Sequence, residues 1–287
     1  MSPPPVKVRC RPIEAVDLVK VADLLAQGFP DRTRKYWTSG LDTLSRRPSP
    51  ADCPRFGYLL EAEGAVVGAI LLIFSESGEG DARRVRCNLS SWYVDPTFRA
   101  YATLLVSAAL KLKHVTYVNI SAAAHTRPIL AAQGYRQYSQ GQFVTLPAFR
   151  SARGVKARRF DPARDQGLPE FDLIQAHAAA GCLAVVVETE GGGREPFLFL
   201  RRRLAYAPLG VMQLVYCRDT EAFARAAGAI GRLLVAQGAL AVICDADGPI
   251  QGMLGRFFRD KAPRYFKGPD QPRLNDLAFT ELVMFGP

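Results

Sequence analysis

The sequence predicts an α/β (α+β) fold made of two consecutive domains, each a mixed, mostly antiparallel sheet flanked by helices. Residues 83–113 run from a strand of β-branched and aromatic residues, through a stop at Asp95-Pro96, into a segment with helical apolar spacing. The order of predicted elements in the first half, hairpin, strand, helix, strand, helix and strand, returns in the second half. A chain of 287 residues is also long for one domain and sufficient for two.

The predicted elements of the first half follow from alternating and helical apolar patterns. Glu63-Gly64 joins two apolar runs and indicates a hairpin, and Gly134 ends a short helix. In order, the predicted elements are a strand at 6–11, helices at 16–25 and 33–44, strands at 56–61 and 66–74, the central strand and helix within 83–113, a strand at 115–121, a helix at 127–133 and a strand at 142–146.

The second half begins after a basic stretch with glycine and proline but no periodicity, which predicts a linker over residues 148–169. The predicted domains are therefore 1–147 and 170–287. Beyond the linker, the predicted elements are a helix at 171–179, strands at 182–189, 196–204 and 209–217, a helix at 220–236, a strand at 240–244, a short helix at 253–258 and a final strand at 277–285.

The composition is that of a globular protein with a core, since 48% of the residues are hydrophobic and 22% charged. No apolar run reaches the roughly 18 residues of a membrane span, and the start, Met1-Ser-Pro-Pro-Pro, lacks the apolar core of a secretory signal. Six scattered cysteines without a Cys-x-x-Cys pair favour reduced thiols and a cytoplasmic location. The net charge of +10 favours anionic partners, but the cations form no long run with interleaved aromatics, which disfavours nucleic acid.

The segment Val94–Arg99, which reads Val-Asp-Pro-Thr-Phe-Arg and precedes a helix, resembles the central motif of the GNAT superfamily of acyl-CoA N-acyltransferases. In that family the strand lies along the pantetheine, and the following loop cradles the CoA pyrophosphate. The element order over residues 6–147 is similar to a whole GNAT domain, and Gly134-Tyr135 stands where such domains carry Gly-Phe or Gly-Tyr. The resemblance implies two GNAT-like domains in tandem, the second more degenerate, with acetyl-CoA or another acyl-CoA as co-substrate and no metal.

The resemblance also implies the site residues and the reaction, in which a small-molecule or peptidyl amine attacks the thioester directly. The backbone amides from Trp92 to Val94 would bind the oxyanion. Asn119 is a candidate for orienting the substrate. His125 is a candidate base, and Tyr135, Tyr138 or His125 is a candidate acid for the departing thiolate. The residues implied to bind the cofactor are Trp92, Tyr93, Val94, Arg99, Ala100, Tyr101, Ala102, Thr103, Leu104 and Arg127.

The sequence departs from the family pattern at three positions. The motif requires Arg or Gln, two residues, Gly, one residue, then Gly or Ala, whereas Ala102 and Leu104 occupy the two glycine positions. Their side chains take up space that the close approach of the backbone to phosphate requires. Leu130 replaces a tyrosine that often protonates the departing thiolate. These departures favour an alternative, a catalytically inactive GNAT-derived binding or interaction protein that has lost CoA.

Two strand-to-helix turns can be ranked as phosphate sites. The helix after the first turn carries Arg99 in its opening turn and has no acid after Asp95, so a phosphate would meet free amides and a cation. The helix after the second turn begins with Asp219, which would cap its own amides, and with Glu221. The first domain is therefore the predicted acyl-CoA site.

Two carboxylates, Asp245 and Asp247, follow a buried strand of the second domain. They would suit a metal or a base acting on an amine. Because Asp-x-Asp-Gly is also an ordinary turn sequence, the turn interpretation is favoured.

Overall fold

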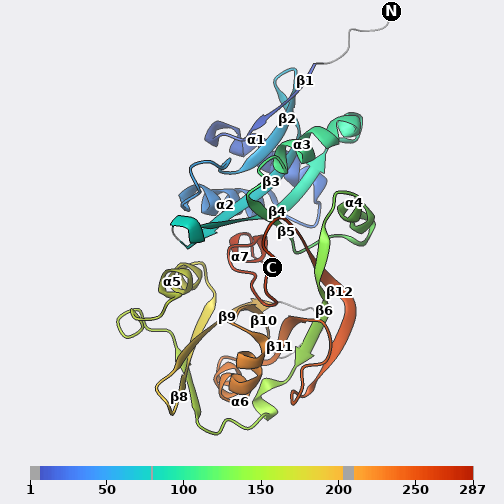
Figure 1. Cartoon of the computed structure of the whole chain (residues 1–287). Coiled ribbons are helices and arrows are strands. Elements are labelled where there is room, and N and C mark those ends of the chain that lie inside the picture. The colour runs from blue at the N-terminus through green and yellow to red at the C-terminus, as the bar shows by residue number, and fades with distance from the viewer. Residues whose placement is uncertain (1–6, 79, 203–209, 287) are drawn as a thin grey trace, which may run out of the picture. The chain divides into compact units, whose positions relative to one another are not determined.

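A computed structural model describes residues 7–78, 80–202 and 210–286 of the chain (Figure 1). Two compact units share these residues, and each combines a long stretch of chain with short C-terminal segments. Unit 1 consists of Met1–Asn119, Phe266–Gln271 and Phe279–Gly286, and unit 2 contains Ile120–Tyr265 and Pro272–Ala278. These bounds differ from the domains predicted from the sequence. The predicted strand ends at Val6, Leu204 and Leu209 lie outside the described residues.

Unit 1 is built on the strand order β1-β2-β3-β4-β5, in which only β4 and β5 pair in parallel. Its core centres on β3, which is buried on both faces from Val67 to Phe74. Helix α1 packs against β3 and β4, and α3 packs against β1, β2 and β3. The elements are β1 (Val8–Pro12), α1 (Leu18–Gly28), α2 (Arg34–Arg46), β2 (Gly57–Ala62), β3 (Ala65–Ser77), β4 (Arg84–Val94), α3 (Ala102–Ala109) and β5 (Val115–Asn119).

The segment Phe279–Gly286 completes unit 1 and holds the short helix α7 (Glu281–Met284). The strand predicted over 277–285 is therefore wrong. Its conformation is set by distant residues, since Asn88 Oδ1 accepts the Glu281 amide at 2.7 Å. Phe285 lies against Gly40, where an added Cβ would stand 1.7 Å from its ring. A four-residue helix fixed by such contacts has no local sequence signal.

Unit 2 has the strand order β12-β6-β11-β10-β9-β8-β7, with β10 and β11 in parallel. Helix α6 buries Phe223 and Ile230 in a core that includes Phe197 and Phe199. Its N-cap Asp219 accepts the Ala222 amide, as the sequence predicts. The elements are α4 (Arg127–Ala132), β6 (Arg136–Thr145), β7 (Val155–Arg159), α5 (Phe171–Ala179), β8 (Leu183–Thr189), β9 (Arg194–Arg202), β10 (Gly210–Tyr216), α6 (Thr220–Ala236), β11 (Ala239–Ala246) and β12 (Gly255–Lys267).

Two parts of unit 2 differ from the sequence analysis. The helix predicted at 253–258 is wrong, because Gly255–Lys267 forms strand β12 beside β6. The strand partner is more than a hundred residues away, so local apolar spacing does not reveal it. Within the predicted linker 148–169, Val155–Arg159 forms strand β7, which pairs with β8 in antiparallel fashion.

The two units repeat the same side-chain network at equivalent places. In unit 1, Arg11 on β1 donates from both Nη atoms to Asp17 at 2.7 and 2.8 Å, and from Nε to Glu61 on β2 at 2.7 Å. The equivalent network of unit 2 joins Arg158 on β7 to Asp165 at 2.7 and 2.6 Å and to Glu188 on β8 at 2.8 Å.

A second repeated contact lies between the parallel strands of each unit. Asn88 Nδ2 on β4 donates to the Val118 carbonyl on β5 at 3.3 Å. Gln213 Nε2 on β10 donates to the Ile243 carbonyl on β11 at 3.2 Å. The order of strands and these shared contacts indicate two copies of one architecture. The predicted fold class, a mixed, mostly antiparallel sheet with flanking helices, is confirmed.

We expect acid to destabilise both units through their repeated aspartates. Hydrogen bonds from Arg11 hold the pKa of Asp17 below its usual range, and those from Arg158 do the same for Asp165. An acid with a lowered pKa stabilises the fold above its unfolded-state pKa of about 4, and this stability is lost as the pH falls through the folded-state pKa. Urea unfolding should therefore give a free energy of unfolding that declines from about pH 5 downward.

The variant Asp165→Asn should flatten that decline, because Asn does not titrate. The matched control is Asp172→Asn, which changes an exposed aspartate of α5 in the same unit. Identical acid dependence in wild type and Asp165→Asn would contradict the assignment.

No helix in the described residues has the length and apolar content needed to cross a membrane.

Candidate active site

The two parallel strands of unit 1 separate part of the way along β4. Pairing runs from Val85 with Val115 to Asn88 with Val118 and ends there. Strand β4 continues to Val94, so in the described part of unit 1 its last six residues have no partner on the β5 side. The backbone groups that face this side have no strand partner among the described residues, and one of the carbonyls, that of Leu89, accepts from Asn88 Nδ2 instead.

Asn88 marks the point of separation. It is 2% exposed, and its Nδ2 donates to the carbonyls of Leu89 at 3.0 Å and Val118 at 3.3 Å. Its Oδ1 accepts the Glu281 amide. The side chain thus joins β4, β5 and the C-terminal segment of unit 1, and this role has no local signal in the sequence.

A β-bulge interrupts β4 in the stretch beyond Asn88. The register against β3 shifts between Ile70, which pairs with Trp92, and Leu71, which pairs with Ser90. Ser91 is the extra residue and has a φ of 27°. A bulge leaves one residue unpaired and changes the direction of its neighbours. Here the bulge changes the direction of the last residues of β4, beyond the point where β4 and β5 separate.

The turn after β4 continues as a 3-10 helix, Pro96–Tyr101, that leads into α3. Asp95 Oδ1 accepts the Thr97 amide at 2.9 Å, so this turn is capped by its own aspartate. The Thr97 amide is therefore not one of the free amides that the sequence analysis expects at this turn. The cap follows from the local sequence, since Asp at the N-cap followed by Pro at the first helical position is a common arrangement.

The exposed side of this turn can still receive an anion. Arg99, Ala100, Thr103 and Leu104 are exposed, and Arg99 makes no ion pair among the residues described. Leu104 is 42% exposed, so its side chain lies on the accessible surface where the family motif has glycine. A phosphate bound at this turn would meet the Arg99 guanidinium, whereas the Asp95 cap and the Leu104 side chain leave it fewer amides and less space.

The structure assigns the predicted site residues to different units. Nine of the ten predicted cofactor-binding residues and Asn119, the last residue of β5, belong to unit 1. The nine are Trp92, Tyr93, Val94, Arg99, Ala100, Tyr101, Ala102, Thr103 and Leu104. They form one continuous stretch along β4, the 3-10 helix and the start of α3.

The other predicted residues belong to unit 2. His125 is exposed in a short 3-10 helix, Ala124–Thr126. Tyr135 is 6% exposed and donates its amide to the Leu130 carbonyl at 3.0 Å. Arg127 opens α4 and donates from Nη2 to the Asp260 carbonyl at 3.3 Å. Their proposed catalytic and phosphate-binding roles stay predictions.

Asp245 is held in a buried ion pair, which corrects its candidate role as base or metal ligand. Its two carboxylate oxygens accept from Arg264 Nε and Nη2, both at 2.9 Å, and its side chain is fully buried. Asp247 lies just after the end of β11, and its Oδ1 accepts the Gln140 backbone amide at 2.8 Å. Asp245 is itself part of β11, so the turn interpretation does not hold for it. In the described part of the chain, no cluster of His, Cys, Asp and Glu could hold a metal ion.

The buried thiols do not offer a nucleophile. Burial raises the pKa of each, to about 12 for Cys182, so they stay protonated at neutral pH. The buried cysteines are Cys87, Cys182, Cys217 and Cys244.

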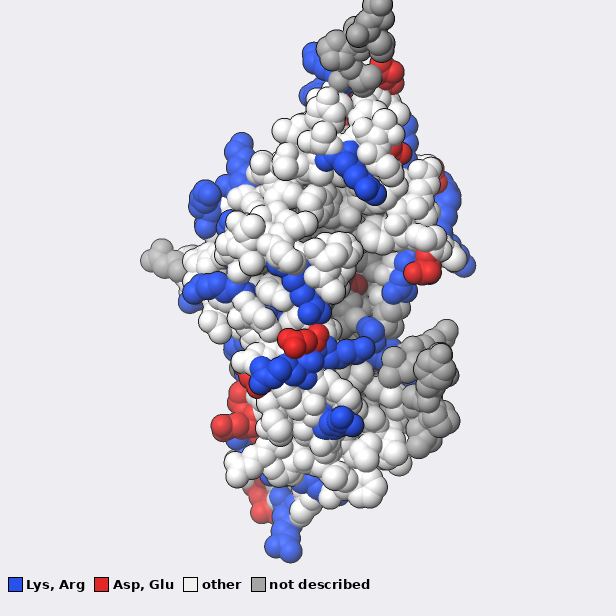
Figure 2. All heavy atoms as spheres, turned by 90° about the vertical axis from the view of Figure 1, so that its right-hand side faces the viewer, with Lys and Arg blue, Asp and Glu red and all other residues white. Residues whose placement is uncertain are grey.

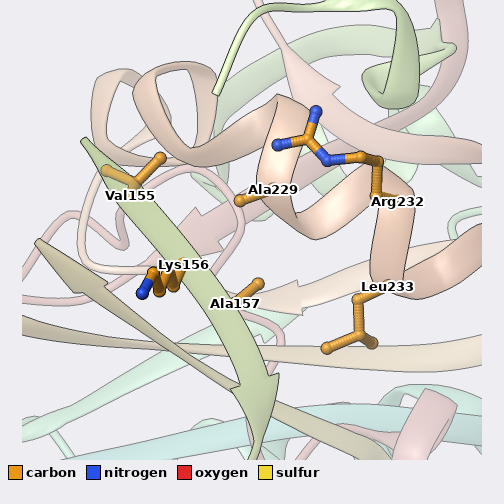
Figure 3. Close-up of a pocket in the computed structure, with 6 residues that line it drawn as sticks. All are labelled: Val155, Lys156, Ala157, Ala229, Arg232 and Leu233. Carbon is orange, nitrogen blue, oxygen red and sulfur yellow. The ribbon is translucent and has the colours of Figure 1, made fainter. Parts of the chain in front are cut away.

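A hollow of about 500 Å³ lies between β7 and α6 of unit 2 (Figure 3). Val155 and Ala157 point from β7 toward the helix, whereas Lys156 points away from it (Figure 3). The rest of the lining is Ala229, Leu233 and Arg232. These residues include no acid, histidine or hydroxyl, and the Lys156 side chain points away from the helix, so the lining offers no pair of groups for acid–base chemistry.

Comparison with known proteins identifies the fold. The first similar structure is a GCN5-related N-acetyltransferase from Anabaena variabilis, with a TM-score of 0.61 and 10% identity over 91% of this chain and 72% of that one. One from Kribbella flavida has a TM-score of 0.56 and 16% identity over 91% and 71%. A putative acetyltransferase from Pyrococcus horikoshii has a TM-score of 0.56 and 12% identity over 95% and 93%. The chain has the GCN5-related N-acetyltransferase fold. No family model and no curated sequence matches it.

Proposed function

We propose that the chain is an acyl-CoA-dependent N-acyltransferase whose acyl-CoA site lies in unit 1. The observation that carries the proposal is the separation of β4 from β5 after Asn88, together with the bulge at Ser91. In the described part of unit 1, this arrangement leaves backbone groups of β4 without strand partners on the β5 side. Such groups can hold an extended ligand and bind a developing oxyanion with little reorganisation.

The proposed reaction is attack of an amine nitrogen on the thioester carbonyl carbon. Amides of the Trp92–Val94 stretch would bind the oxyanion, and Asn119 at the end of β5 would orient the acceptor. Arg99 on the exposed side of the turn would pair with a phosphate. We expect acetyl-CoA or a longer acyl-CoA as donor, no metal, a small-molecule or peptidyl amine as acceptor, and a cytoplasmic location.

A second candidate is a binding module with the same fold that has lost CoA. Two observations favour it, the Asp95 carboxylate that already occupies the Thr97 amide and the exposed Leu104 side chain. Both reduce the space and the amides available to a pyrophosphate. This module would show no heat effect and no thermal stabilisation with any acyl-CoA.

Calorimetric titration with acetyl-CoA and with a longer acyl-CoA separates the two candidates. The acyltransferase should bind and raise its unfolding midpoint as ligand saturates. The variant Arg99→Glu should weaken binding by about 10- to 100-fold, because it removes a charged hydrogen bond and adds repulsion. If the acyl group binds along the unpaired part of β4, the longer acyl-CoA and acetyl-CoA should bind with different affinities.

Arg9→Glu supplies the matched control, since Arg9 is an exposed arginine of β1 in the same unit. It makes the same change in charge and should leave acyl-CoA affinity within about twofold, by weak exposed electrostatics. Equal losses of acyl-CoA affinity in both variants would mean that the effect of Arg99→Glu comes from net charge and not from a contact with the ligand. Absence of binding to either thioester would overturn the proposed function.

A further inference from the structure

Strands β6 and β12 of unit 2 expose an unusual set of side chains. Met253 and Phe257 pack against the buried core of the unit, so the alternate residues point to the other side. Leu254 is 59% exposed and Phe258 is 40% exposed, and Arg256 between them is also exposed. Two large apolar side chains exposed on either side of Arg256, Leu254 just before β12 and Phe258 within it, indicate a contact surface.

The neighbouring strand β6 continues this surface with polar side chains. In its second half the buried positions are Gly141, Phe143 and Thr145, so Gln140, Gln142 and Val144 take the outward positions. We define the β6–β12 face by the outward residues of both strands. These are Gln140, Gln142, Val144, Leu254, Arg256 and Phe258.

Basic groups are arranged on and beside this face. The Arg256 guanidinium lies 5.3 Å from the centroid of the Phe258 ring, and that of Arg259 lies 5.9 Å from the Phe257 ring. Arg256, Arg259 and Lys261 are exposed and form no ion pair in the part of the chain that is described. Figure 2 shows the side of unit 2 that carries β6 and β12, where most of the surface is neither basic nor acidic and Lys and Arg groups are scattered across it.

We propose that the β6–β12 face binds single-stranded nucleic acid. An exposed aromatic ring beside a guanidinium offers a stacking platform for an unpaired base, and free cations attract the phosphate backbone. The Gln142 amide on β6 can donate to and accept from base edges, whereas Gln140 Oε1 already accepts from Arg259 Nη1. An acidic protein surface would not use the exposed ring, and two apolar side chains among glutamines are few for a lipid surface. This inference does not depend on acyl transfer.

Fluorescence anisotropy with labelled single-stranded RNA and DNA oligonucleotides of mixed sequence tests the proposal. We expect binding that weakens steeply with salt, since about three phosphates are neutralised, and the logarithmic slope should be about −2. Phe258→Ala should weaken binding by about tenfold, and Phe258→Leu by a similar factor, because both lose stacking. Phe258→Trp keeps an aromatic ring at this position and should therefore bind with at least the affinity of the wild type. A preference for RNA would add a contact to the 2′-hydroxyl, whereas equal affinities would indicate stacking and charge alone.

Arg232→Ala on α6 is the charge control for Arg256→Ala, because both residues are exposed arginines of unit 2. Only Arg256→Ala should weaken binding. Unchanged affinity in Phe258→Ala, equal effects of the two arginine variants, or absence of binding to both oligonucleotides would overturn the proposal. Binding of wild type to anionic lipid vesicles but not to oligonucleotides would assign the face to membranes and would also overturn it.

Discussion

Replacing Asp245 by alanine should lower the free energy of unfolding by about 3–5 kcal/mol, which is among the largest effects of any single change in the chain. The carboxylate is fully buried and makes two hydrogen bonds to Arg264, whose own side chain is 5% exposed. Removing it leaves a buried guanidinium without its counter-ion. Chemical unfolding followed by circular dichroism measures the effect.

The matched control, Asp247, lies two residues further along the chain, just after the end of β11. Asp247→Ala removes a carboxylate that accepts one amide at an exposed position, and it should cost about 1 kcal/mol or less. A double variant, Asp245→Leu with Arg264→Met, should recover most of the lost stability, because apolar replacements of a buried pair are often neutral. An Asp245→Ala cost no larger than that of Asp247→Ala would contradict the structural role.

This ion pair illustrates why sequence alone left the role of Asp245 open. A carboxylate after a buried strand is compatible with a base, a metal ligand, a turn or a partner of a distant arginine. Arg264 lies on β12, a strand that the sequence analysis interpreted in part as a helix. Because the sequence analysis does not predict β12, it gives Arg264 no position near Asp245. The ion pair therefore cannot be predicted from the sequence.

The parts of the fold that the sequence predicts best are those with strong local patterns. The predicted helices at 171–179 and 220–236 have the same bounds as α5 and α6, because apolar spacing and, for α6, the Asp219 cap mark them. The hairpin signals are similarly local. By contrast, β12 and α7 depend on β6 and Asn88, which are far away in the sequence.

In the candidate site, too, features with a local sequence signal are predicted and features that depend on distant strands are not. The resemblance indicates the stretch from Trp92 to Leu104, and the structure shows it as a continuous path along β4 and α3. The bulge at Ser91 and the junction at Asn88 are missing from the sequence analysis, since each is defined by pairing with another strand. The Asp95 cap, however, has a local signal in its Asp-Pro-Thr sequence.

Restoring glycine at both motif positions, Ala102→Gly with Leu104→Gly, should strengthen acyl-CoA binding by about tenfold if unit 1 is an acyl-CoA site. The Leu104 side chain is 42% exposed on the turn surface, and without it the backbone can approach a pyrophosphate closely. The same change should lower the free energy of unfolding by about 2 kcal/mol, because each glycine in α3 costs about 1 kcal/mol in helix propensity.

The two effects have opposite signs, which makes the test specific. Calorimetry reports the gain in affinity, and chemical unfolding without ligand reports the loss of stability. Ser107→Gly, at an exposed position further along α3, is the control that shares the helix penalty but lies outside the motif. Its affinity for acyl-CoA should equal that of the wild type. A stability loss in the double variant without any gain in affinity would favour the binding module that has lost CoA, because the space opened at the turn would then have no pyrophosphate to receive.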